Sequence, residues 1–292
     1  MCHNAQMNRP GIELRTMLAS DLPVGLHLCR ACGWNQLDED WLYFLQADGA
    51  GARVAERQQD AVGTVAWLRY GAAFSWIAMM LVDPDARHAG IGSRLFESAL
   101  EELRNEPCIR LDATPAGEPL YRRYGFIDEY GLVRTKTIVT PNQFEPSHHD
   151  VVPIQPGDLP EIFARDRVVF GADRSALLTS FFRRAPHFSR IAREHGILTG
   201  YCFGRPGHLY SQLGPIVAGD TEIARALIAH SLAPQAGASF AIDVPKQATE
   251  LIKWMETVGF VIERPFLRMC RGDNPSPGLP DHIYGIAGPE FG

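Results

Sequence analysis

The segment that follows an apolar run contains residue types suited to binding a phosphate group. The run Trp76 to Val82 is followed by Pro84, which ends a strand because proline cannot donate to the ladder. Arg87-His88-Ala89-Gly90-Ile91-Gly92 comes next, and a helical pattern begins there. Glycine lets the backbone approach a ligand closely, and the unpaired N–H groups of a first helical turn favour an anion. Arg87, with His88 and Arg94 as further cations, would add charge-assisted contacts, so this spacing predicts a pyrophosphate site.

Two other interpretations of this loop are open. A Rossmann dinucleotide site would account for Asp112, which stands 20 residues after Gly92, where a ribose-binding acid is expected. However, G-I-G-S-R-L lacks the third glycine of that fingerprint, and the preceding strands are typical of an antiparallel meander. The other interpretation is an ordinary strand-to-helix turn that contains two glycines.

The pattern of apolar residues predicts an α+β unit with a mainly antiparallel sheet in the first part of the chain. The predicted strands are 11–18, 52–57, 62–70, 73–82, 108–113 and 126–137, and the predicted helices are 21–32, 38–47, 91–105 and 118–124. Pro-rich, polar residues at 140–153 predict a linker that exposes His148 and His149.

The pattern returns beyond this linker, which predicts a duplicated fold. Gly125-Phe126 and Arg134 recur as Gly259-Phe260 and Arg268 at an offset of 134, the helix stripe Ile91, Leu95, Phe96 recurs as Ile223, Leu227, Ile228 at 132, and the turn at Gly71 recurs at Gly204 at 133. We therefore expect two domains, residues 1–140 and 150–292.

The composition excludes several classes of protein. The 292 residues are 46% apolar and 21% charged, as in ordinary globular proteins, and no apolar run is long enough to span a membrane. A net charge of -6 argues against a nucleic-acid partner. The N-terminus lacks a signal-peptide stretch, so a cytoplasmic protein is expected. Of six cysteines, only Cys29 and Cys32 form a C-x-x-C, and we expect ordinary reduced thiols and no metal site.

Two motifs together resemble the GNAT superfamily of N-acetyltransferases. V-D-P-D-A-R-H-A-G-I-G-S-R-L, residues 82–95, is similar to its acetyl-CoA signature, and L-Y-R-R-Y-G-F, residues 120–126, places a tyrosine four residues before Gly-Phe. The resemblance covers roughly residues 11–138, and G-W-N-Q at 33–36, L-D-A-T-P-A-G and I-A-G-P-E-F-G are similar to its tandem branch. It implies an α+β fold (an α/β/α sandwich) with two tandem GNAT-like domains, each a mixed, mostly antiparallel sheet flanked by helices.

The resemblance also implies roles for particular residues. The backbone of Met80, Leu81 and Val82 would pair with the pantetheine arm of acetyl-CoA. Arg87, His88, Ala89, Gly90, Ile91, Gly92 and Ser93 would hold the pyrophosphate, and a backbone N–H near Leu81 would polarise the thioester carbonyl. Tyr121 would be the general acid, with Tyr124 second, and the alternative for Tyr121 is a packing role.

The sequence does not identify the general base. Family members often carry a carboxylate six residues before the V of V-x-P, and this chain has Trp76 there. Asp112 is the best remaining carboxylate, although a water relay or a turn-capping role for Asp112 is equally open. Trp34, Asn35 and Gln36, with Glu39 and Trp41, would line the acceptor pocket. The alternative is that the tryptophans belong to the core.

These expectations combine into a prediction of function. In residues 214–225 of the second domain, no arginine and no G-x-G pair precedes the expected helix, and Asp220 and Glu222 stand at its start, so that domain is predicted to lack the coenzyme. The chain is predicted to transfer acetyl from acetyl-CoA to an amine of a small molecule or peptide by direct attack in a ternary complex. The alternative is a non-catalytic acyl-CoA-binding sensor. A monomer is favoured, and a homodimer is possible.

Overall fold

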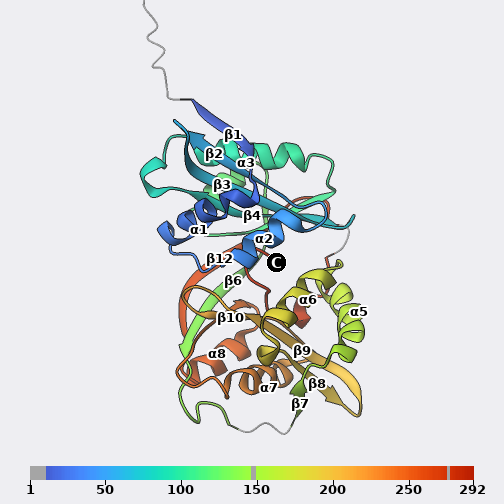
Figure 1. The fold of residues 1–292 in the computed structure, drawn as a ribbon. Coiled ribbons are helices and arrows are strands. Elements are labelled where there is room, and N and C mark those ends of the chain that lie inside the picture. The colour runs from blue at the N-terminus through green and yellow to red at the C-terminus, as the bar shows by residue number, and fades with distance from the viewer. Residues whose placement is uncertain (1–10, 146–148, 275–276) are drawn as a thin grey trace, which may run out of the picture. The chain divides into compact units, whose positions relative to one another are not determined.

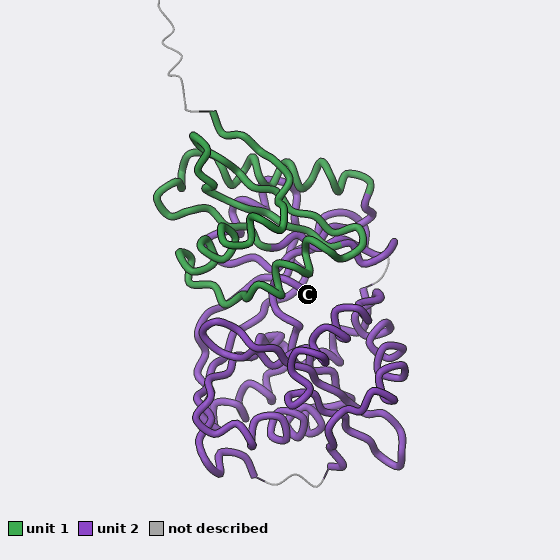
Figure 2. Tube along the Cα trace, viewed as in Figure 1, with its two compact units in different colours: residues 1–68, 79–105 green, residues 69–78, 106–292 purple. Residues whose placement is uncertain are grey.

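The computed structural model describes residues 11–145, 149–274 and 277–292 (Figure 1). The chain forms two compact units: unit 1 contains residues up to 68 together with 79–105, and unit 2 contains 69–78 together with 106–292 (Figure 2). Strands β3 (Asp60–Tyr70) and β4 (Phe74–Val82) each contribute residues to both units. The predicted domain boundary at residues 140–150 does not coincide with the boundary between these two units, and it remains a prediction. Below, "first half" means residues 11–145 and "second half" means 149–292.

The described residues of unit 1 form a small sheet and three α-helices. Strands β1 (Ile12–Thr16), β2 (Gly51–Arg57) and β3 pair antiparallel. The helices are α1 (Leu22–Ala31), α2 (Asp38–Gln46) and α3 (Ile91–Glu102). Helix α3 buries Ile91, Leu95 and Phe96, the stripe that the 3.6-residue period predicts.

Unit 2 has a longer sheet with the strand order β5-β12-β6-β11-β10-β9-β8-β7, and β13 pairs with β10. These strands are β5 (Cys108–Ala113), β6 (Ile127–Ile138), β7 (Asp150–Pro153), β8 (Arg190–Glu194), β9 (Ile197–Arg205), β10 (Ser211–Ala218), β11 (Ser239–Pro245), β12 (Val261–Gly272) and β13 (Ile283–Gly285). The helices are α4 (Glu118–Arg123), α5 (Leu159–Phe170), α6 (Ser175–Arg184), α7 (Thr221–Leu232) and α8 (Thr249–Thr257). Most pairs are antiparallel, while β4–β5 and β10–β11 are parallel.

Two strands are exchanged between the halves within this sheet. Strand β12 of the second half lies between β5 and β6 of the first, and β6 pairs on its other side with β11 of the second half. Each half therefore completes its sheet with a strand from the other half.

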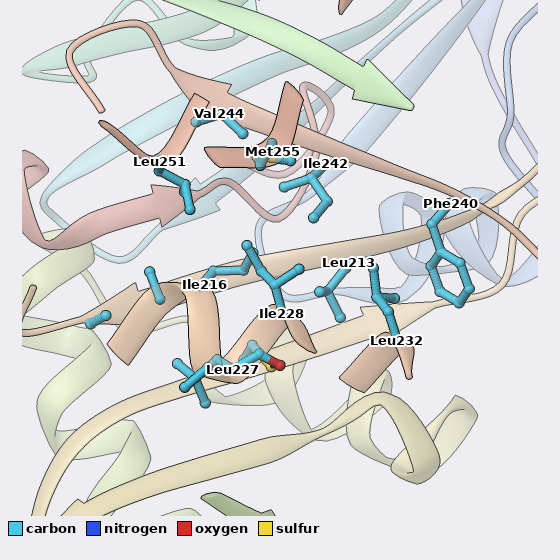
Figure 3. Packing of buried hydrophobic residues seen from close by; sticks show 14 of the residues in the cluster. Leu213, Ile216, Leu227, Ile228, Leu232, Phe240, Ile242, Val244, Leu251 and Met255 are labelled. Carbon is cyan, nitrogen blue, oxygen red and sulfur yellow. The ribbon is translucent and has the colours of Figure 1, made fainter. Parts of the chain in front are cut away.

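The core of the second half lies between its strands and two helices. Leu213 and Ile216 of β10, with Ile242 of β11, point toward Leu227 and Ile228 of α7 (Figure 3). All five side chains are fully buried. Each fully buried aliphatic side chain stabilises the fold by about 1.5–3 kcal/mol relative to exposure.

The predicted elements of residues 11–138 are confirmed to within three residues at each end. The repeat is confirmed at Gly125 and Gly259, which follow α4 and α8 with φ of 82° and 87°, the left-handed conformation that ends a helix. The predicted turn at Gly204 is wrong, because this residue lies inside β9. A Cβ atom at Gly204 would stand 2.9 Å from Cβ of Phe188, so close packing accounts for the glycine.

The linker prediction is wrong for its last four residues. Asp150–Pro153 form β7, which pairs antiparallel with β8. His148 lies outside the described residues. His149 is half-buried, with Nδ1 at 3.6 Å from a carboxylate oxygen of Glu194.

Candidate functional site

The connection between β4 and α3 in unit 1 has the geometry expected of an anion site. Gly90 is the N-cap residue of α3 with φ of 79°, and no side chain caps the helix there. A Cβ atom at Gly90 would meet nothing within 4 Å, so the space above the first turn is open. His88 also has a positive φ, 64°. Left-handed residues close together turn backbone N–H groups toward one side, as in anion-binding nests.

Gly92 brings the helix close to the end of β4. A Cβ atom at this residue would stand 3.5 Å from Cε of Met80 and 3.8 Å from Cγ2 of Val82. Unit 1 therefore brings together the residues predicted for the pantetheine arm, 80–82, and those predicted for the pyrophosphate, 87–93. Residues 87–90 are exposed, and Leu81 is buried.

Arg87 lies against the end of β4. Its guanidinium donates to the carbonyl oxygen of Val82 (3.3 Å) and to Sγ of Cys32 (3.4 Å). The same Cys32 thiol lies 3.8 Å from the Val82 oxygen. Cys32, two residues before the predicted acceptor residue Trp34, thus lies beside the predicted coenzyme loop within unit 1.

The predicted acceptor residues differ in exposure. Asn35 and Gln36 are buried, and Trp34 is half-buried between α1 and α2. Trp41 is fully buried, and a Cβ atom at Gly25 would stand 2.7 Å from its ring. Trp41 therefore belongs to the core, as the alternative interpretation expects.

Tyr121 lies on α4 in unit 2 and is 8% exposed. A Cβ atom at Gly117 would stand 2.9 Å from the Tyr121 ring, so the glycine makes room for the ring. Burial raises the pKa of the Tyr121 phenol above its usual value of about 10. The phenol therefore remains protonated at neutral pH, as a general acid requires. Tyr124 is half-buried at the C-cap of α4.

Asp112 is held in a buried ion pair with an exchanged strand. Both oxygens of its carboxylate accept from Arg268 of β12, at 2.8 Å each, and the two side chains are 0% and 1% exposed. Arg268 also donates to the hydroxyl of Tyr130 (2.6 Å). Burial raises the pKa of the Asp112 carboxyl, and the Arg268 guanidinium opposes this effect. These contacts give Asp112 a structural partner in Arg268.

The same arrangement recurs with the halves reversed. Arg134 of β6 donates to both oxygens of Asp243 on β11, at 2.7 Å each, and to the hydroxyl of Tyr210 (2.8 Å). Each arginine therefore stands on an exchanged strand, and each aspartate belongs to the other half. Residues with the same role in a duplicated fold are expected to share surroundings, and Asp112 and Asp243 do.

Trp76 occupies the strand position at which family members often carry the base. Its side chain is fully buried, and its indole N–H donates to the carbonyl oxygen of Pro289 (3.0 Å). The Arg268 guanidinium lies 4.7 Å from the ring centroid. This position is therefore part of the packed interior of unit 2.

The segment 286–292 is anchored in unit 2 by contacts that sequence reasoning missed. The Tyr70 hydroxyl donates to the carbonyl oxygen of Phe291 (2.7 Å), and Arg174 donates to that of Gly292 (2.8 Å). Arg174 is itself paired with Asp166 at 2.9 Å in a fully buried contact. The one signal in the sequence is I-A-G-P-E-F-G, which shows a resemblance but no partner.

The second half has a different helix start. Asp220 is the N-cap of α7, and its carboxylate accepts from the backbone N–H of Ile223 (2.9 Å), while Glu222 lies in the first turn. The predicted positions of both acids at this helix start are confirmed. A carboxylate therefore takes the N–H group that an anion would otherwise bind.

The ranges that the structure describes contain neither a membrane-spanning helix nor a metal-binding cluster. No helix among them is long and apolar enough to cross a membrane. Within residues 11–145, 149–274 and 277–292, no group of three or more His, Cys, Asp or Glu side chains is arranged to hold a metal ion. The five cysteines in the same ranges are free thiols.

Comparisons with known proteins agree with this architecture. Two family models, each described as an acetyltransferase (GNAT) domain, match residues 48–128 and 162–285. The chain is 26% identical over 239 residues to the uncharacterized N-acetyltransferase YitH of Bacillus subtilis (strain 168), covering 80% of this chain and 83% of that protein. It is 28% identical over 252 residues to the holothin acyltransferase of Pseudoalteromonas sp. (strain SANK 73390), covering 85% and 84%.

Solved structures show the same fold. A putative acetyltransferase from Pyrococcus horikoshii superposes with a TM-score of 0.78 at 23% identity and covers 100% of this chain and 99% of its own. A tandem GNAT protein from the clavulanic acid biosynthesis pathway superposes with a TM-score of 0.64 at 15% identity, covering 91% and 100%. The predicted mixed sheet flanked by helices is confirmed. The chain therefore belongs to the GNAT family of acyltransferases, as a protein with two GNAT domains in tandem.

Proposed function

We propose that this chain transfers an acetyl group from acetyl-CoA to an amine of a small molecule or peptide, by direct attack in a ternary complex. The observation that carries the proposal is the start of α3, where Gly90 leaves the first helical turn uncapped by any side chain and open above it. Residues 87–93 would hold the pyrophosphate there, and the backbone of residues 80–82 would pair with the pantetheine amides. The N–H near Leu81 would polarise the thioester carbonyl.

Tyr121 would supply the proton that the leaving group needs. The amine nitrogen forms a bond to the carbonyl carbon, the carbon–sulfur bond breaks, and the thiolate takes the Tyr121 proton. The neutral amine that attacks loses one proton to solvent, and Tyr121 recovers a proton from solvent, so the products are the amide and the free thiol of coenzyme A. Burial keeps the phenol in the protonated form that can donate to the leaving group, but the raised pKa also makes it a weaker acid.

We propose a water relay as the general base. An alkyl amine has a pKa near about 10 and must lose a proton before it attacks. Asp112, the carboxylate favoured from sequence, would have to leave its two bonds to Arg268 to accept that proton. Trp76 stands where family members often carry a carboxylate, and its N–H is bonded to Pro289.

The amine acceptor would contact the segment between α1 and α2. Asn35 and Gln36 offer amide groups, and Trp34 offers a half-buried ring that suits a cationic or polar acceptor. One relative is named a holothin acyltransferase, so an acceptor related to holothin is one of the amines to test. We further propose a monomer, because each half already completes its sheet with a strand from the other.

A panel of amines tests the proposal. Purified protein is incubated with acetyl-CoA and each amine, and release of the coenzyme A thiol is followed with a thiol reagent. Release that depends on an amine, with an acetylated product seen by mass spectrometry, is the expected result. Tight binding of acetyl-CoA without thiol release in any mixture would instead favour the non-catalytic sensor. This alternative is tested because a buried tryptophan, Trp76, stands where family members often carry the catalytic carboxylate.

A further inference from the structure

The strand pair β10–β11 of the second half repeats the strand pair β4–β5. Strand β4 pairs in parallel with β5 at Ser75↔Ile109 and Trp76↔Arg110. Strand β10 pairs in parallel with β11 at Ser211↔Phe240 and Gln212↔Ala241. Each pair thus makes two parallel contacts at the start of its first strand.

The surroundings of two glycines show which later residues of β4 and β10 correspond to each other. A Cβ atom at Gly63 would meet the carbonyl oxygen of Leu81 at 2.9 Å, and one at Gly200 would meet that of Val217 at 2.9 Å. Side chains of α3 and α7 complete the two surroundings at matching positions. Val217 is therefore the counterpart of Leu81, and Ile216 is the counterpart of Met80. These are the positions proposed above to pair with the pantetheine arm.

In the second half, the chain itself pairs with these positions. Strand β13 runs antiparallel to β10, with Gly285 opposite Ile216 and Ile283 opposite Val217. The next residue, Ile286, donates its N–H to the carbonyl oxygen of Asp243 on β11 (3.0 Å). The segment from Ile283 to Ile286 therefore bonds to both strands of the pair.

We propose that β13 occupies, in the second half, the place that the pantetheine arm of acetyl-CoA takes in the first, so that each chain binds one acetyl-CoA. The inference rests on the proposed function, because that function defines the place at residues 80–82. A peptide strand and a pantetheine arm both offer amide N–H and C=O groups to a strand edge, so either can satisfy it.

Side-chain packing fits β13 to this place. A Cβ atom at Gly285 would stand 2.9 Å from Cδ1 and 3.0 Å from Cγ1 of Ile216, so glycine permits the close approach. Ile283 is buried at 7% exposure. The following segment is fixed where Trp76 and Tyr70 donate to the carbonyl oxygens of Pro289 and Phe291.

Covalent attachment favours β13 over a free ligand. A tethered segment competes at an effective concentration that reaches about millimolar for short flexible links. An incoming coenzyme would also meet the carboxylate of Asp220 at the start of α7, where the first half has the bare N-cap Gly90. The covalent tether of β13 and the negative charge of Asp220 both act against coenzyme binding in the second half.

Two glycine variants form a matched pair for the test. Gly92→Val adds a side chain to the first-half loop, and Gly219→Val adds one between β10 and α7. Added Cβ atoms would stand no closer than 3.5 Å to their neighbours at Gly92 and 3.6 Å at Gly219, which is ordinary contact. Neither glycine has a positive φ, so both variants are expected to fold.

Isothermal titration with acetyl-CoA gives the stoichiometry and the affinity. We expect one site in the unaltered protein, at least about a 100-fold weaker affinity in Gly92→Val, since several charge-assisted bonds are lost, and an unchanged affinity in Gly219→Val. Hydrogen exchange supplies the location: acetyl-CoA should slow exchange at residues 79–93 and leave residues 214–221 and 283–286 unchanged.

The outcomes separate the two proposals. A stoichiometry of two, a site lost in Gly219→Val, or faster exchange at 283–286 with coenzyme present would overturn the role of β13 and leave the first-half site standing. Unchanged affinity in Gly92→Val, with no protection at 79–93, would overturn the proposed function. The inference would then fall with it, because the equivalent place in the first half would be undefined.

Discussion

The replacement Asp112→Asn separates a structural from a catalytic role for this carboxylate. The change keeps the shape of the side chain but removes its charge, so Arg268 loses its ionic partner while remaining 1% exposed. One amide oxygen can still accept a hydrogen bond, but the amide nitrogen presents a donor to the guanidinium. A buried arginine would face an uncompensated charge.

The expected cost follows from the burial of the pair. Removing one partner of a buried ion pair lowers the free energy of unfolding by about 3–5 kcal/mol. Because whole proteins are stable by about 5–15 kcal/mol, this is a large fraction of the total. Urea unfolding followed by tryptophan fluorescence measures the change directly, and the midpoint should fall markedly.

Two control variants make the result specific. Asp243→Asn disturbs the reciprocal pair with Arg134, whose side chains are 0% and 6% exposed, and should cost a similar amount. Glu118→Gln removes an exposed partner of Arg122, with side chains 34% and 45% exposed, and should cost less than about 1 kcal/mol. A loss under about 1 kcal/mol in Asp112→Asn would refute the argument from burial.

Turnover then tests the catalytic alternative. It is measured in urea-free buffer at a temperature where both aspartate variants are folded. Loss of a general base reduces turnover by about 10²–10⁴-fold, whereas a structural carboxylate leaves the folded enzyme active. Such a loss in Asp112→Asn, with none in the equally destabilised Asp243→Asn, would show that Asp112 is the base and that the water relay is wrong.

The remaining predictions concern the proposed general acid Tyr121, the helix cap Asp220, and the two strand glycines Gly63 and Gly200. Tyr121→Phe should reduce kcat and leave acetyl-CoA affinity nearly unchanged, whereas Tyr124→Phe should leave both unchanged; equal losses in the two variants would argue against the acid role. Since burial raises the pKa of Tyr121, any loss of kcat from its ionisation should lie above pH 10, and a pH profile checks this. Asp220→Ala should lower the free energy of unfolding by about 1 kcal/mol, measured in urea, because α7 loses its cap. Gly63→Ala and Gly200→Ala should each cost about 1–3 kcal/mol in the same assay, since a Cβ atom would press on a carbonyl oxygen at 2.9 Å; unchanged midpoints would contradict the packing argument.

Local signals in the sequence were sufficient for most elements. The amphipathic period of α3, the glycines after α4 and α8, and the proline at residue 84 each act within a few residues of the structure that they determine. The exchange of β6 and β12 could not be read in this way. Strand pairing joins residues far apart in the chain, and an apolar strand pattern does not name its neighbour.

The same difference between local and distant contacts decides which residues of the candidate site could be predicted from the sequence. The loop at residues 87–92 could be proposed as an anion site because that chemistry depends on adjacent backbone groups and one helix start. The surroundings of Trp76 and Asp112 could not, because their partners Pro289 and Arg268 come from the second half. The repeat of Arg134 at Arg268 was visible in the sequence, but not that each pairs with an aspartate of the other half.

The reciprocal exchange gives the second half a structural role beside the first. Where two neighbouring strands of a sheet separate, their facing edges have N–H and C=O groups that need partners. In the second half β13 supplies such partners to β10 at Ile216 and Val217. The second half must still be folded, since β12 is the partner of β5 and carries the arginine that pairs with Asp112. The second half thereby supplies both a strand and a buried arginine to the first half.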